Sequence, residues 1–196
     1  MSRTTGREDR ADPAEMADLE PVERFIVWCF RRWVIGAHDR STDHWGMVWN
    51  ELAGGLGAAD GREALTQFSG MIRALQEHAR KTIHHHGPCC PCLGPDELRF
   101  IRLIAACQHR RPGEARALAE WMILPDGATA LLQAATRLGQ ILRAHDVMLP
   151  DRYVPGRHVV GVVPGGGLRA VGDPRRARAV AEFAAQPAPG ARIVLH

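Results

Sequence analysis

The sequence lacks any long run of apolar residues. The longest uninterrupted run, residues 25–30, has six apolar side chains in a chain of 196 residues. A helix that crosses a membrane needs about 20 such residues, so the sequence predicts no membrane span. The first 20 residues hold six acidic and three basic side chains and no apolar stretch. We therefore expect no secretory signal peptide.

Lysine is also nearly missing. Lys81 stands against 24 arginines, and the abundance of Ala, Gly, Arg and Pro is typical of a high-GC genome, which favours a bacterial origin. Residues 151–196 hold seven arginines and only three acidic side chains, so the net charge of +3 arises in this segment. The arginines at 175–178 have no aromatic side chains among them. We interpret this run as a solvated surface, and nucleic acid is not an expected partner.

Three common catalytic patterns are missing as well. The chain has no G-K-[ST] phosphate loop, no G-x-S-x-G nucleophile turn and no H-E-x-x-H pair of zinc-binding histidines. These patterns place the reactive groups of P-loop nucleotide hydrolases, α/β-hydrolases and many zinc proteases. Their absence argues against all three classes of enzyme.

The sequence does have helical periodicity. Hydrophobic residues make up 45% of the chain and charged residues 24%, as is usual for a globular protein. Apolar side chains recur at spacings of three and four, which indicates amphipathic helices. We predict helices over 21–35, 43–53, 60 to about 84–87, 95–111, 112–124 and 125–145, with the glycine-rich run 54–61 as a break. The third of these helices carries an apolar stripe that comprises Leu65, Phe68, Ile72, Leu75, Ala79 and Ile83.

The predicted fold class is all-α. Because the links between successive helices are short, we expect an antiparallel bundle of five to six helices over residues 20–149. A flexible acidic leader, residues 1–19, precedes the bundle. Residues 150–196 are expected to form a largely irregular C-terminal extension, rich in Gly, Pro and Arg, with a candidate strand at 159–163 and a candidate short helix at 173–186.

Cysteine usage carries the main chemical signal. Five cysteines are an odd number and no export signal accompanies them, so we expect a reducing cytoplasmic location and no disulfide framework. Three of the five lie in the segment HHHGPCCPC, residues 84–92. Imidazole nitrogen and thiolate sulfur are the ligands that zinc prefers, usually in tetrahedral sets of four. The candidate metal ligands are His85, His86, Cys89, Cys90 and Cys92.

Several readings of this segment remain open. Zinc is the expected ion, while an Fe–S cluster or a haem bound through Cys90 are alternatives, and Cys89 with Cys90 is a candidate redox-active pair. The pair Cys107 and His109 lies about 12 residues into the next helix, roughly 18 Å from the segment, too far to share the ion. Other candidates for the remaining ligand are His78, Asp96 and Glu97.

The spacing His85-x3-Cys89-x2-Cys92, placed between two helices, resembles the zinc motif of zinc-associated anti-sigma factors. The similarity covers eight of the 196 residues. That family has a further ligand upstream of the motif, for which this sequence has no clear counterpart. The resemblance implies a zinc ion that stabilises the fold or responds to redox conditions.

These observations favour a non-enzymatic zinc-binding helical protein that acts as a regulatory, adaptor or assembly subunit. A metal-dependent or thiol redox enzyme that uses the His/Cys segment is the alternative. The expected partner is another protein chain, because the predicted helix at 21–35 is apolar nearly all round. Such a helix is buried in the core or covered by a partner. The C-terminal extension is the second candidate surface for that partner.

Overall fold

The all-α prediction is confirmed in a computed structural model, which describes residues 13–151 and 193–195. These residues form five α-helices: α1 (Pro21–Asp39), α2 (Thr42–His78), α3 (Pro95–Gln108), α4 (Pro112–Met122) and α5 (Pro125–Ala144). Four of the five begin at proline, whose fixed φ and missing N–H suit the first helical position. None of the helices in the described part of the chain is long and apolar enough to cross a membrane.

The two helices predicted on either side of the glycine-rich run are joined in α2. The run interrupts helical geometry only at Gly57, where φ is 77° and ψ is 165°. A residue with a side chain rarely adopts such a positive φ, whereas glycine does so freely. The predicted break within 54–61 is therefore confirmed, but it is confined to Gly57, where the two helical arms of α2 meet at a kink.

The prediction also put the C-terminal end of α2 too far along the sequence. The helix ends at His78, six to nine residues before the predicted end at 84–87. Its last carbonyl accepts the N–H of Leu124 (2.8 Å), and the N–H of Arg80 donates to the carbonyl of Met122 (3.1 Å). These contacts with the end of α4 replace the next helical turn, so Ala79 and Ile83 stay buried outside the helix.

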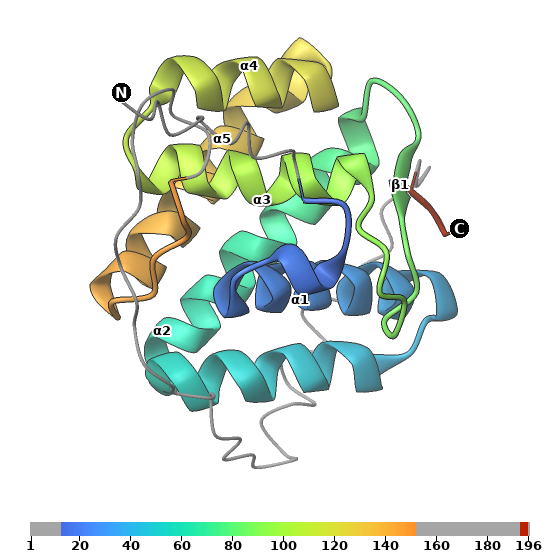
Figure 1. Ribbon diagram of the computed structural model, residues 1–196, viewed down its shortest axis with the longest axis vertical. Coiled ribbons are helices and arrows are strands. Elements are labelled where there is room, and N and C mark those ends of the chain that lie inside the picture. Colours follow the sequence, from blue (N-terminus) through green and yellow to red (C-terminus); the bar gives the residue numbers. More distant parts are fainter. Residues whose placement is uncertain (1–12, 152–192, 196) are drawn as a thin grey trace, which may run out of the picture.

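After this turn the chain forms a short strand, β1 (Ile83–His85), which pairs in parallel with β2 (Ile193–Leu195). Figure 1 shows both strands beside the N-terminal end of α3, at one side of the bundle. Three residues of the predicted irregular extension are thus extended and paired. The candidate strand at 159–163 and the candidate helix at 173–186 lie outside the described residues.

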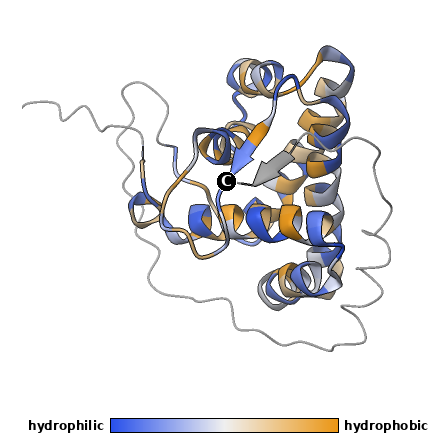
Figure 2. Cartoon of the chain, turned by 90° about the vertical axis from the view of Figure 1, so that its right-hand side faces the viewer, coloured by the Kyte–Doolittle hydropathy of each residue, from blue (hydrophilic) through white to orange (hydrophobic). Residues whose placement is uncertain are grey.

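An aromatic cluster joins three helices at the centre of the bundle. Phe100 of α3 lies 4.8 Å from Phe30 of α1 and 5.6 Å from Phe68 of α2, measured between ring centroids. Trp33 of α1 packs edge-on against Phe68 at 6.2 Å. In Figure 2 the helices carry hydrophobic and hydrophilic residues on different sides. The apolar helix α1 is accordingly buried over most of its length by α2 and α3.

The described end of the predicted acidic leader packs against the bundle. This N-terminal segment, residues 13–19, includes a short 3-10 helix, η1 (Met16–Asp18). The side chain of Leu19 is buried in the core, and the side chain of Asp18 accepts hydrogen bonds from the N–H groups of Ala14 and Glu15. The bundle therefore begins earlier than residue 20.

Candidate metal centre

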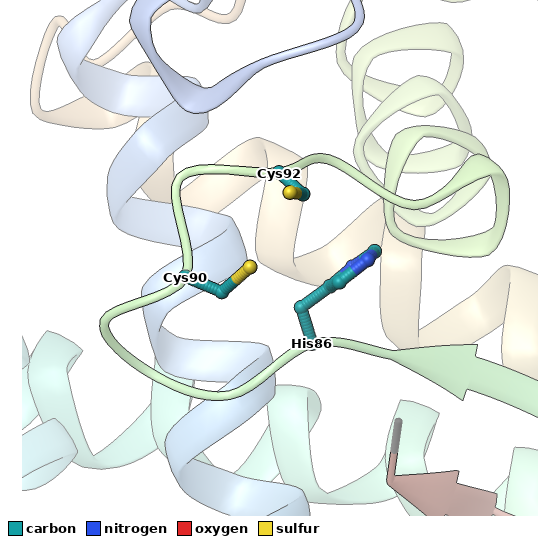
Figure 3. A group of neighbouring side chains, drawn as sticks. All are labelled: His86, Cys90 and Cys92. Carbon is teal, nitrogen blue, oxygen red and sulfur yellow. The ribbon is translucent and has the colours of Figure 1, made fainter.

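Three of the five predicted ligands converge in the loop between β1 and α3, here called the cysteine loop (residues 86–94). One donor atom each from His86, Cys90 and Cys92 lies within 4.8 Å of the others. Figure 3 shows the three side chains directed toward a common space, with His86 directly after β1 and the two cysteines on the far side of the loop. An imidazole and two thiols at this separation form a group that could hold a metal ion.

The other two predicted ligands lie outside this group. His85 points to the opposite side of β1, where its ring is 2% exposed and meets Phe30 edge-on at 6.1 Å. Burial lowers the pKa of His85, so the ring is a neutral core side chain. Cys89 is exposed in the turn closed by the hydrogen bond from the N–H of Cys90 to the carbonyl of Gly87 (3.1 Å). The converging residues are therefore spaced His-x3-Cys-x-Cys.

The more distant candidates lie outside the converging group. His109 contacts the carbonyl of Leu149 through Nε2 (2.7 Å). Cys107 is half-buried on α3, and burial raises the pKa of its thiol. His78 ends α2, five residues before β1.

A buried arginine holds the cysteine loop together. Arg31 of α1 is fully buried, and its Nε and one terminal nitrogen donate to the two carboxylate oxygens of Glu97 at 2.7 and 2.9 Å. Its remaining donors bind the carbonyls of Gly87 (3.1 Å), Cys90 (2.7 Å) and Cys92 (2.6 Å). All five N–H donors of the guanidinium are thus used, and three of them fix the backbone of the loop.

Glu97 completes this network from the first turn of α3. Its carboxylate also accepts the N–H groups of His86 (3.0 Å) and Gly94 (2.8 Å), one at each end of the cysteine loop. Burial alone would raise the pKa of Glu97, but the hydrogen bonds from Arg31, Gly94 and His86 outweigh it, and the pKa is lowered. The side chain is therefore an ionised acceptor.

The same carboxylate orients the imidazole of His86. Nδ1 of His86 lies 3.2 Å from Oε2 of Glu97, and an ionised carboxylate can only accept a hydrogen bond. Nδ1 therefore carries a proton, which leaves Nε2 as the ring nitrogen that can offer a lone pair to a metal ion. Carboxylates commonly hold metal-binding histidines in this way.

Asp96 is the second carboxylate at the start of α3, and its oxygens are also occupied by hydrogen bonds and ion pairs. It accepts the N–H of His84 (3.0 Å) and forms ion pairs with Lys81 (2.9 Å) and Arg99 (3.1 Å). Both cations also lie over the ring of Trp121, with the Lys81 nitrogen 3.9 Å and the Arg99 guanidinium carbon 3.5 Å from its centroid. Asp96 and Glu97 thus fix the loop and are unsuited to serve as bases.

The N-terminal segment lies against the cysteine loop. The N–H of Met16 donates to the carbonyl of Pro91 (2.7 Å), and the N–H of Leu93 donates to that of Ala14 (3.1 Å). The loop is therefore contacted by the N-terminal segment and α1, which are distant from it in sequence, and by α3, which follows it directly.

The thiol of Cys92 is not an activated nucleophile. A hydrogen bond with Cys90 is the main cause that raises the pKa of Cys92, and the neighbouring negative charges of Cys90 and Glu15 act in the same direction. A reactive cysteine instead needs a lowered pKa, because the thiolate is the attacking species. A bound cation would reverse this effect by stabilising both thiolates.

Sequence reasoning missed Arg31, although a signal was present. Arg31 follows Val27 by four residues and precedes Val34 by three, so all three share one face of α1. Both valines are buried, and a charged residue on a buried helical face needs a partner. The partner could not be read from the sequence, because Glu97 is 66 residues away.

Comparisons with known proteins add no functional evidence to the geometry of the candidate metal centre. No protein-family model, curated protein or solved structure matches the chain.

Proposed function

We propose that the protein is a non-enzymatic metal-binding protein in which His86, Cys90 and Cys92 hold a zinc ion that stabilises the cysteine loop. The observation that carries the proposal is the convergence of one nitrogen and two sulfur donors within 4.8 Å. Zinc fits this set of ligands best, since two thiolates and an imidazole recur in its tetrahedral sites. An Fe–S cluster or a haem is the alternative occupant.

A structural role is favoured over a catalytic one by the surrounding carboxylates. A hydrolytic zinc site needs an open coordination position and commonly a base beside it. The two carboxylates at the start of α3, Asp96 and Glu97, are buried and occupied by cations and backbone N–H groups. The raised pKa of Cys92 likewise argues against this thiol as an attacking thiolate.

We further propose that the protein acts as a regulatory, adaptor or assembly subunit through a protein partner. The aromatic rings of Phe25 and Trp28 stack at 6.2 Å on the outer side of α1 and are only half-buried. They border a surface hollow lined by Met16, Pro21, Arg24, Phe25, Trp28 and Glu51. Aromatic side chains and arginine are enriched at protein–protein contacts.

Elemental analysis of the protein, purified without a histidine tag, tests the proposed metal. We expect about one zinc ion per chain. Cys90→Ser and Cys92→Ser should each lower the zinc content and the melting temperature, whereas Cys89→Ser, the matched control on the same loop, should change neither. Metal-free wild-type protein with freely reactive Cys90 and Cys92 would contradict the proposal, and iron in place of zinc would support the alternative occupants.

A further inference from the structure

Glu15 and Cys92 face each other across the contact between the N-terminal segment and the cysteine loop. They form an isolated antiparallel bridge, and the two backbone hydrogen bonds described above flank the pair on either side. Residues flanked in this way are a non-hydrogen-bonded pair, in which the Cα atoms are only about 4.5 Å apart and the side chains lie closest. Both side chains therefore leave the ladder on the same face.

The side chains of Glu15 and Cys92 start side by side, because the two residues face each other as a non-hydrogen-bonded pair. Both residues are exposed, so the side chain of Glu15 has room to change rotamer. A carboxylate that stands beside a metal-binding thiol is itself a candidate ligand.

The distances allow Glu15 to bind the same ion. With Zn–S near 2.3 Å and Zn–O near 2.0 Å, a tetrahedral site places sulfur and oxygen about 3.5 Å apart. The Cβ atoms of directly opposed residues are about 4.5–5.5 Å apart, and the longer side chain of glutamate spans the difference. Cys89 is the competing donor, and neither its sulfur nor the carboxylate of Glu15 is among the converging atoms. Glu15 is favoured because it directly faces Cys92, whereas Cys89 lies in the exposed turn of the loop.

We propose that Glu15 supplies the fourth ligand of the metal site. The ion then joins the N-terminal segment to the cysteine loop, with Glu15, His86, Cys90 and Cys92 as the complete set. This inference rests on the proposed function, since it requires that the other three residues bind zinc.

Competition with a chromophoric chelator, starting from metal-free protein, measures the zinc affinity of the variants. Glu15→Gln should lower the affinity at least about tenfold, because a ligand should matter no less than an outer hydrogen-bond partner. Glu15→His should retain most of the affinity, since imidazole can replace the carboxylate as a donor. Glu20→Gln removes a charge from the same stretch of chain and should have no such effect, and neither should Cys89→Ser.

Wild-type affinity in Glu15→Gln, or a loss in Cys89→Ser alone, would overturn the assignment of Glu15 while leaving the proposed zinc site intact. Wild-type protein that binds no zinc would overturn both. Amide hydrogen exchange gives a second readout: zinc should slow exchange at Met16 and Leu93 in the wild type but much less in Glu15→Gln. Equal protection in both proteins would contradict the inference.

Discussion

The α2–α5 interface and the cysteine loop are stabilised by different interactions, apolar packing in the first and buried charges in the second. In the interface, apolar side chains of α5 such as Leu131, Leu138 and Leu142 are buried against α2. In the loop, the fixed points are buried charges, chiefly Arg31 with Glu97. In apolar packing, the stability lost on substitution grows with the volume of the cavity that is left. A buried polar network instead fails as a unit when one member is left unpaired. Three mutational tests can break or sharpen this contrast.

The largest effect is expected from Arg31→Met. The variant leaves Glu97 buried without its cation and leaves three loop carbonyls without their donor. Breaking a buried ion pair in this way costs about 3–5 kcal/mol of stability. Urea denaturation measures the loss. Because the loop would also lose its order, zinc affinity should fall with stability. Arg116→Met, which removes an exposed arginine that is paired with Glu120, is the control and should cost less than about 1 kcal/mol.

Leu131→Ala should produce a loss of a different kind. Leu131 is fully buried, and replacing such a leucine by alanine costs about 3 kcal/mol. Zinc affinity should stay unchanged, because α5 lies away from the cysteine loop (Figure 1). Leu132→Ala, at the half-buried neighbouring position, should cost less. A parallel fall in zinc affinity would show that the two regions are coupled and would remove the contrast.

The smallest effect is expected from a chain that ends after Asp151. This truncation removes β2 but keeps the buried Leu149 and the ion pair between Asp151 and Arg111 (2.9 Å). Loss of the few backbone hydrogen bonds with β1 should cost about 1–2 kcal/mol, and the helical circular dichroism should remain. An unfolded product would show that the C-terminal segment is integral to the bundle.

The helices could be predicted because their signals are local. Proline at Pro21, Pro95, Pro112 and Pro125 marked four helix starts correctly. The apolar stripe of α2 was also correct in burial but not in conformation, since it continues through Ala79 into Ile83 of β1. Helix and strand can both bury residues four apart, so periodicity did not reveal where α2 ends. The contacts with Met122 and Leu124 decide that end.

The candidate site could be predicted only in part. Residue types and proximity in sequence pointed to the segment in which three donors converge, but spacing alone could not separate His86 from His85. Their roles are set by the alternation of β1, which turns His85 toward Phe30 and leaves His86 on the other side. The burial of Arg31 and the opposition of Glu15 and Cys92 are tertiary features. No local pattern encodes them.

The two carboxylates at the start of α3 have a consequence for aggregation. A strand with free N–H and C=O groups invites pairing with another chain. On one side β1 is covered by β2. On the other side the N–H groups of His84 and His86 donate to the carboxylates of Asp96 and Glu97. Side chains from the first turn of α3 therefore accept the hydrogen bonds that a neighbouring strand would otherwise accept. This arrangement protects the strand edge beside the cysteines, where pairing between molecules would otherwise compete with the native loop.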